Sequence, residues 1–90
     1  EEIEFNLLDL LDEMAAMFSV QAEKKHSQIS IIYPYKDPLI VAGDPFRLKQ
    51  ILTNLIGNAL KFTEHGRVTL GVYKETETRF RFEVTDTGVG

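Results

Sequence analysis

The 90-residue sequence contains no cysteine and no tryptophan. The lack of cysteine excludes disulfide bonds, thiolate metal sites and a cysteine nucleophile, and it suits a reducing compartment. No apolar run approaches the roughly 18 residues that a membrane-spanning helix needs, and no signal peptide is visible. Ten basic residues stand against fourteen acidic ones, which gives a net charge of −4 with no basic cluster. This balance argues against nucleic acid and against direct contact with an anionic membrane surface.

The length and composition predict one small folded domain. A hydrophobic content of 43% is ordinary for a globular chain. A chain of this size buries only about 60–65% of its unfolded surface, so its stability should be marginal. We see no internal repeat, low-complexity tract or linker.

Apolar residues recur at helical spacing in two stretches of the chain. Asn6 is placed to cap the first helix, which should run to about Lys25. The apolar stripe of this helix comprises Leu7, Leu8, Leu11, Met14, Ala15, Phe18 and Ala22. In the second stretch Asp44 is a good N-cap, Pro45 suits the first helical position, and Gly66 should end the helix in the left-handed conformation.

Alternating apolar residues predict strands between and after these helices. The expected strands are residues 1–5, 28–33 and 39–42, followed by a hairpin whose inward residues are Val68, Leu70, Val72, Phe80, Phe82 and Val84. The expected fold class is therefore α+β, a two-layer sandwich with two long helices on one face of a mainly antiparallel sheet.

The second helix should carry an apolar stripe and a polar strip side by side. The stripe consists of Leu48, Ile51, Leu52, Leu55, Ala59 and Phe62, and the strip consists of Arg47, Asn54, Asn58 and Lys61. Asparagine is a mediocre helix former, so two of them on one line suggest a ligand. An amide oxygen can coordinate Mg²⁺, and a lysine can offset phosphate charge. From helix geometry alone, a solvated polar face explains the strip equally well.

The chain ends in Asp86-Thr87-Gly88-Val89-Gly90 after a predicted strand. The Asp86 carboxylate can accept a hydrogen bond from an exocyclic amine such as that of adenine. Gly88 and Gly90 allow positive φ angles and a close approach of backbone to ligand. Alone, this pattern is weak and is often only a turn.

Together the two motifs resemble the ATP-binding catalytic domain of sensor histidine kinases, over essentially the whole chain. Residues 44–63 are similar to that family's N box. The matching residues are Asp44-Pro45-x-Arg47-Leu48 and Asn54-Leu55-Ile56-x-Asn58-Ala59-x-Lys61-Phe62-Thr63. Residues 86–90 are similar to its first glycine box. The resemblance implies a Bergerat-type (GHKL) ATP fold, with ATP and Mg²⁺ as cofactors.

The resemblance also implies roles for single residues. Asn58 would bind Mg²⁺, Lys61 would contact phosphate, and Phe62 would line the adenine pocket. A backbone-bonded asparagine, a solvated lysine and a core phenylalanine are the respective alternatives. Asn54 lies where gyrase, mismatch-repair and heat-shock chaperone ATPases carry a glutamate that activates water. An amide cannot take a proton from water, so Asn54 favours a kinase over a hydrolytic ATPase. For Arg47 the alternatives are steering of phosphates and an ion pair with a nearby carboxylate, of which we favour the ion pair.

Asp86 would bind the adenine amine, with Gly88 and Gly90 shaping the pocket. His26 and His65 lack the sequence context of the family's phosphoacceptor. That histidine is expected on a separate dimerisation domain, from which phosphate passes to a response regulator. The parent is expected to be a membrane-attached sensor with this domain on its cytoplasmic side.

The family's domain continues beyond the first glycine box with a lid segment and a second glycine box. Residues 1–90 are therefore expected to be the N-terminal part of such a domain, inactive alone and prone to self-association through an open sheet edge. Two alternatives stay open: a non-catalytic nucleotide-sensing or docking module, and a GHKL-type ATPase, which Asn54 disfavours.

Overall fold

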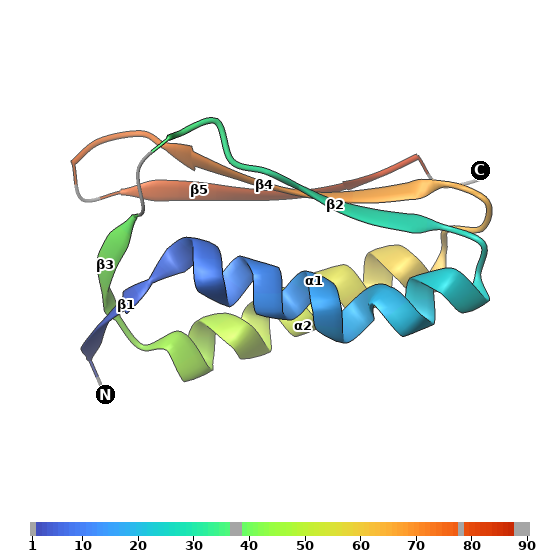
Figure 1. Cartoon of the computed structure of the whole chain (residues 1–90), viewed down its shortest axis with the longest axis horizontal. Coiled ribbons are helices and arrows are strands. Elements are labelled where there is room, and N and C mark those ends of the chain that lie inside the picture. The colour runs from blue at the N-terminus through green and yellow to red at the C-terminus, as the bar shows by residue number, and fades with distance from the viewer. Residues whose placement is uncertain (1, 37–38, 78, 88–90) are drawn as a thin grey trace.

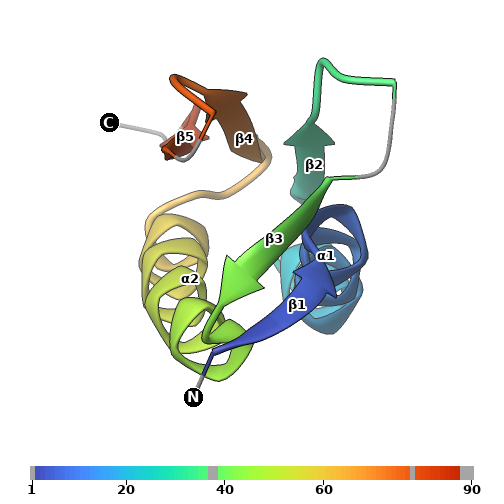
Figure 2. The ribbon, with the colours of Figure 1, turned by 90° about the vertical axis from the view of Figure 1, so that its left-hand side faces the viewer.

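The computed structural model describes residues 2–36, 39–77 and 79–87. One layer consists of two helices, α1 (Leu7–Lys24) and α2 (Pro45–Lys61). The other layer is a sheet of three strands, β2 (Gln28–Ile32), β4 (Arg67–Lys74) and β5 (Phe80–Asp86) (Figure 1). Two short strands, β1 (Ile3–Asn6) and β3 (Ile40–Gly43), pair with each other across one end of the helix layer (Figure 2). The predicted α+β sandwich with both helices on one face of the sheet is confirmed.

The three-stranded sheet is mixed, in the order β2-β4-β5. Strands β4 and β5 form the predicted antiparallel hairpin, with Leu70 opposite Val84. Strands β2 and β4 run parallel, with Ile31 opposite Leu70, because the chain between them crosses the helix layer through α2. Strands β2 and β5 lie at the two edges of the sheet.

The first helix begins as its sequence predicts. Asn6 Oδ1 accepts hydrogen bonds from the backbone N–H groups of Leu8, at 3.0 Å, and Asp9, at 3.4 Å. These bonds satisfy two of the donors that the first turn of a helix leaves without partners. The buried residues of α1 are Leu7, Leu10, Leu11, Met14, Phe18 and Ala22. Leu10 was missing from the predicted stripe, whereas Leu8 and Ala15 are only half-buried.

The predicted apolar stripe of α2 is partly wrong. The buried residues are Leu52, Ile56 and Leu60, which follow each other at four-residue steps. Ile51, Leu55 and Phe62 are 51%, 44% and 66% exposed. Apolar residues cover so much of this helix that periodicity alone does not define its inner side. Packing on the sheet and on α1 selects the row of Leu52, Ile56 and Leu60, with Leu48 and Ala59 beside it.

The prediction for Gly66 is also wrong in its physical reason. His65 has the left-handed conformation after α2, with φ 54°, and no glycine among the described residues has a positive φ. Gly66 is required by space instead. A Cβ atom there would collide with Thr87 Oγ1 and would lie 3.0 Å from Thr63 Cγ2. The α2–β4 turn and the end of β5 can therefore approach each other closely only when residue 66 has no side chain.

The core lies between the helix layer and the sheet. Val68, Leu70 and Val72 of β4 are at most 1% exposed, and Phe82 and Val84 of β5 pack against them. The predicted inward face of the hairpin is thereby confirmed for these five residues, whereas Phe80 is half-buried and lines a hollow at the end of the sheet. Within the described part of the chain, no helix is long and apolar enough to cross a membrane.

Candidate functional site

The polar strip of α2 is present and faces away from the core. Arg47, Asn54, Asn58 and Lys61 are all exposed. They share one side of the helix because residues at these spacings differ by small rotations about the helix axis. The exposed residues Ile51, Leu55 and Phe62 form a second row, between the strip and the buried row. The outer side of α2 thus offers amide, ammonium and apolar groups next to each other.

Lys61 and Phe62 lie together at the C-terminal end of α2. Lys61 Nζ is 5.5 Å from the centroid of the Phe62 ring, within the range of a cation–π contact. With 66% of its surface exposed, Phe62 is no core residue, which removes the alternative reading of its role. The two residues line a hollow of about 550 Å³ together with Lys25, Glu64 and His65.

Asp86 lies at the end of β5, opposite Val68 of β4, and it is exposed. The next residue, Thr87, is tied to Arg67: Arg67 N–H donates to Thr87 Oγ1 at 2.8 Å, and Thr87 N–H donates to Arg67 O at 3.0 Å. These bonds hold the beginning of the predicted glycine box against the start of β4. Gly88 and Gly90 lie outside the described residues.

Asn54 borders a different hollow from Lys61 and Phe62. This groove of about 500 Å³ runs between α1 and α2 and is lined by Met14, Met17, Phe46 and Thr53 among others. An ion pair between Lys49 and Glu13 bridges the two helices there. Neither this groove nor the hollow at Lys61 includes Asn58 or Asp86. The predicted residues thus share the outer side of α2 and the end of β5, without being gathered in one enclosed pocket.

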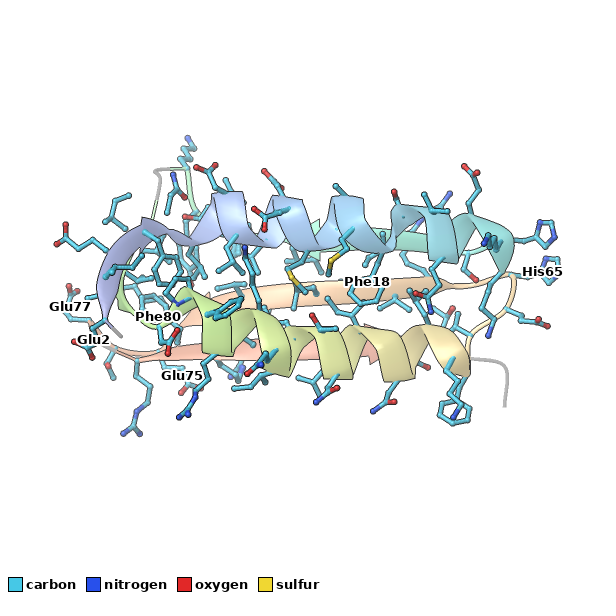
Figure 3. The ribbon with its side chains drawn as sticks, turned by 90° about the horizontal axis from the view of Figure 1, so that it is seen from below. Glu2, Phe18, His65, Glu75, Glu77 and Phe80 are labelled. Atoms are coloured by element: carbon cyan, nitrogen blue, oxygen red, sulfur yellow. The ribbon has the colours of Figure 1, made fainter. Side chains whose placement is uncertain are left out.

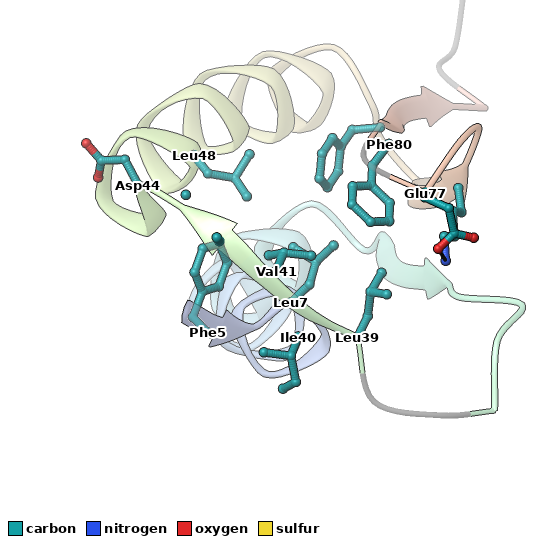
Figure 4. A pocket seen from close by; sticks show the side chains of 13 residues that line it. Phe5, Leu7, Leu39, Ile40, Val41, Asp44, Leu48, Glu77 and Phe80 are labelled. Atoms are coloured by element: carbon teal, nitrogen blue, oxygen red, sulfur yellow. Dashed lines mark ion pairs between the residues drawn. The ribbon is translucent and has the colours of Figure 1, made fainter. Parts of the chain in front are cut away.

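A further hollow of about 540 Å³ lies at the end of the molecule away from Lys61, between the β1–β3 pair and the β4–β5 hairpin (Figure 4). Its lining is mainly apolar and includes Phe5, Val41, Leu48 and Phe80, with Asp44 also lining it.

The Arg47 N–H donates to the Asp44 carboxylate, which lowers the pKa of Asp44 below its usual 3.8, and the Phe46 N–H acts in the same direction. This carboxylate therefore serves as a helix cap.

The side chains of this face fit a magnesium ion that is shared with a ligand. Among residues 2–36, 39–77 and 79–87, no three histidine, cysteine, aspartate or glutamate residues are grouped to hold a metal ion. Asn58 offers one exposed amide oxygen. Mg²⁺ is commonly bound through one or two protein oxygens and completes its shell with waters and phosphate oxygens. The single donor fits that mode of binding.

The contact made by Lys25 could not be predicted from the sequence. Lys25 Nζ donates to the carbonyl oxygens of Leu60, at 2.9 Å, and of Lys61, at 2.7 Å. The partners are 35 and 36 residues away in the sequence, so no local pattern reveals them. The only local signal was a basic residue beside the end of α1.

Comparison with known proteins gives consistent matches. Residues 43–90 match the profile of the family described as histidine kinase-, DNA gyrase B-, and HSP90-like ATPase. The sensor protein GacS of Pseudomonas syringae pv. syringae is 39% identical over 94 residues, covering 100% of this chain and 10% of that protein. BarA, a signal transduction histidine-protein kinase of Escherichia coli K12, is 37% identical with the same coverage. The chain thus spans about a tenth of the length of these curated relatives.

Solved structures of histidine kinases have the same fold. The catalytic domain of ThkA in a nucleotide-free form matches with a TM-score of 0.86 and 31% identity, covering 99% of this chain and 60% of that one. ThkA in complex with the response regulator TrrA matches with a TM-score of 0.84 and 30% identity, covering 98% and 26%. Full-length ShkA in complex with AMPPNP matches with a TM-score of 0.86 and 36% identity, covering 98% and 19%.

Proposed function

Because the chain belongs to the family of histidine kinase-, DNA gyrase B-, and HSP90-like ATPases, we propose that it is the ATP-binding catalytic part of a sensor histidine kinase. Residues 1–90 form the N-terminal part of that domain, with an N box at 44–63 and a first glycine box at 86–90. The whole protein binds Mg-ATP and transfers the γ-phosphate to a histidine on a separate dimerisation domain.

The observation that carries this proposal is the exposed row of Asn54, Asn58 and Lys61 beside the exposed ring of Phe62. The buried side of α2 is already complete without these residues, so the fold does not need them for packing. Amide oxygens, an ammonium group and an apolar ring are the groups that a metal-bound triphosphate and a flat base would contact. The likeness to GacS and to BarA adds independent support.

Each residue has a defined role in this proposal. Asn58 contributes its amide oxygen to Mg²⁺, and the Lys61 ammonium offsets phosphate charge. The Phe62 ring packs on the adenine, and Asp86 accepts a hydrogen bond from the adenine amine. Gly88 and Gly90 let the backbone approach the nucleotide. Bound magnesium would supply further neutralisation of the charge that develops on the phosphate oxygens.

Asn54 favours phosphoryl transfer to a protein over hydrolysis. A hydrolytic enzyme needs a base that accepts a proton from water, and a neutral amide cannot do so. Phosphoryl transfer depends mainly on positioning and on electrostatic stabilisation, with the acceptor imidazole as the nucleophile. Asn54 then orients the metal-bound phosphates, directly or through water.

Two further parts of the proposal concern partners and place. The response regulator in the ThkA complex supports a relay from the phosphorylated histidine to such a protein. A location on the cytoplasmic side of a membrane-attached sensor agrees with the absence of cysteine.

The 90-residue chain alone should also self-associate. Within the described residues, β5 pairs with β4 on one side only, so its other edge presents unpaired backbone groups. Light scattering after size exclusion at tens of micromolar protein should reveal dimers or larger species. A sharp monomer peak with a cooperative thermal transition would contradict this expectation.

The proposed function is tested with Asn58→Ala in the complete kinase that carries this sequence. We expect loss of autophosphorylation and loss of the magnesium dependence of ATP binding, with an unchanged circular dichroism spectrum. Gln21→Ala is the matched control, because it removes an exposed amide from α1. Autophosphorylation of Asn58→Ala within about a factor of two of the wild type, which corresponds to less than about 0.5 kcal/mol, would remove Asn58 from the metal role.

A further inference from the structure

The turns that follow the two helices lie against each other at one end of the molecule. We call this contact the turn junction; it comprises residues 25–28 after α1 and 64–67 after α2. His65 marks its place, at the opposite end from Phe80 (Figure 3). Two backbone hydrogen bonds join the two turns: His65 N–H donates to Lys25 O at 3.1 Å, and Gln28 N–H donates to Gly66 O at 2.9 Å.

Side chains strengthen the turn junction. Gly66 N–H donates to the buried Ser27 Oγ at 3.2 Å. The rings of His26 and His65 stack with centroids 5.0 Å apart and planes 8° from parallel. Both histidines have left-handed backbones, with φ angles of 53° and 54°. A left-handed residue is a common way to end a helix, and in the turn after α1 it comes with a hydrogen bond from Ser27 N–H to Ala22 O at 2.9 Å.

Lys25 extends the junction to the last turn of α2. The carbonyl groups of a helix's last turn have no partners within the helix, and the helix dipole favours a cation there. Lys25 Nζ meets both requirements for α2 by donating to Leu60 O at 2.9 Å and to Lys61 O at 2.7 Å. Lys25 belongs to a different element, so it caps α2 from outside.

The same junction reaches the end of β5. Arg67 follows Gly66 and exchanges two hydrogen bonds with Thr87, the residue after Asp86. The structure thus joins the two ends of the candidate site through one junction, with Lys61 and Phe62 on one side and Asp86 on the other.

We propose that Lys25 is a positioning residue of the nucleotide site, which acts by fixing the backbone of Lys61 and, through it, the direction of Lys61 and Phe62. Both side chains are exposed, so core packing does not orient them, and the last turn of α2 has to do so. Lys25 also lines the same hollow as Lys61 and Phe62. The inference rests on the proposed nucleotide-binding role of these two residues.

The test compares Lys25→Met with Lys24→Met in the complete kinase. Lys24 lies in the last turn of α1 and is exposed, so its substitution removes the same charge from the same helix end. We expect Lys25→Met to weaken Mg-ATP binding about fivefold or more, whereas Lys24→Met changes it less than about twofold. Lys25→Arg should restore most of the affinity, because a guanidinium group can also donate to two carbonyl oxygens.

Two further readouts separate positioning from other roles. Amide hydrogen exchange in the last turn of α2 should be faster in Lys25→Met and unchanged in Lys24→Met. In a background that carries both Lys61→Met and Phe62→Ala, Lys25→Met should weaken binding by less than about twofold, because both side chains that it positions are gone. If Lys25→Met does not fold, Lys25→Gln takes its place.

Two outcomes would overturn the inference. Faster exchange with unchanged Mg-ATP affinity would make Lys25 a helix cap only. A full additional loss of affinity in the Lys61→Met and Phe62→Ala background would mean that Lys25 acts elsewhere, for example by touching phosphate itself. If Asn58→Ala and Lys61→Met both leave Mg-ATP binding unchanged, the proposed function fails first, and the exchange data still report whether Lys25 holds α2.

Discussion

Leu52 and Leu55 offer a sharp test of how α2 is oriented. The apolar periodicity of the sequence treats them alike, yet Leu52 is 1% exposed and Leu55 is 44% exposed. Truncation of each to alanine makes the same chemical change in the same helix, three residues apart. Alanine is also the best helix former, so neither change should weaken the helix through its propensity. Any difference in stability therefore comes from burial.

The expected costs differ by a factor of about three or more. Leu52→Ala removes a leucine from a closed core, which typically lowers the free energy of unfolding by about 3–5 kcal/mol. Leu55 is only about half buried, so Leu55→Ala should cost about 1 kcal/mol, half the transfer free energy of a leucine side chain. For a domain of this size, the two midpoint temperatures should then differ by roughly 10 °C or more.

Urea unfolding followed by far-ultraviolet circular dichroism measures both costs, at a protein concentration low enough to keep the chain monomeric. The dependence of unfolding free energy on urea should keep one slope in all variants, which shows that stability alone has changed. If Leu52→Ala is too unstable to give a folded baseline, Leu52→Met and Leu55→Met form a milder pair, with costs below about 1.5 kcal/mol. Equal costs, or a larger cost at Leu55, would refute the orientation of α2 described here.

Three further predictions concern single groups. Hydrogen bonds from Arg47 N–H and Phe46 N–H lower the pKa of Asp44. The ionised Asp44 therefore stabilises the fold above the usual pKa of 3.8, and this contribution is lost as pH falls through the pKa of the folded state. Urea titrations from about pH 6 to pH 2 should show less acid sensitivity in Asp44→Ala than in the wild type. Gly66→Ala should cost about 1–3 kcal/mol through its clash with Thr87, and Thr87→Ala should relieve part of that cost in a double-mutant cycle. Asp86→Asn should reduce the preference for ATP over GTP, because an amide can turn to present a donor; an unchanged preference would argue against adenine recognition by Asp86.

The sequence predicts this fold well wherever the cause is local. Asn6 and Asp44 accept the helix-capping bonds that their positions suggest. The alternation in β4 and β5 correctly gives the side of the hairpin that faces the helices. These features depend only on residues a few positions away, so their causes are visible in the sequence.

The failures arise where the cause is distant in the sequence. Ile56 and Leu60 are buried because the sheet and α1 meet that side of α2, and a helix with several apolar rows does not reveal which one will be covered. Gly66 is needed because Thr87 lies against it, although Thr87 comes after the whole β4–β5 hairpin in the sequence. Lys25 finds its partners 35 and 36 residues away. Each of these facts is a property of the packed chain.

The candidate site falls between these two cases. Helical spacing correctly predicts that Asn54, Asn58 and Lys61 share one exposed side of α2. It does not predict that Phe62 leaves the core to lie beside Lys61, because periodicity places that ring with the other apolar residues. The exposed position is the one that makes Phe62 available to a ligand.

The exposed apolar row of α2 is informative because the fold does not need it. Ile51, Leu55 and Phe62 remain 51%, 44% and 66% exposed although a complete buried row lies on the same helix. The exposed part of each side chain gains nothing from the hydrophobic effect, which depends on surface removed from water. Directly beside them lies a row of amides and a lysine, so one side of α2 combines an apolar strip with a polar one. A ligand with a flat apolar base and a charged, metal-bound tail would cover both rows at once. The small stability cost expected for Leu55→Ala and the proposed nucleotide site are therefore two consequences of one arrangement.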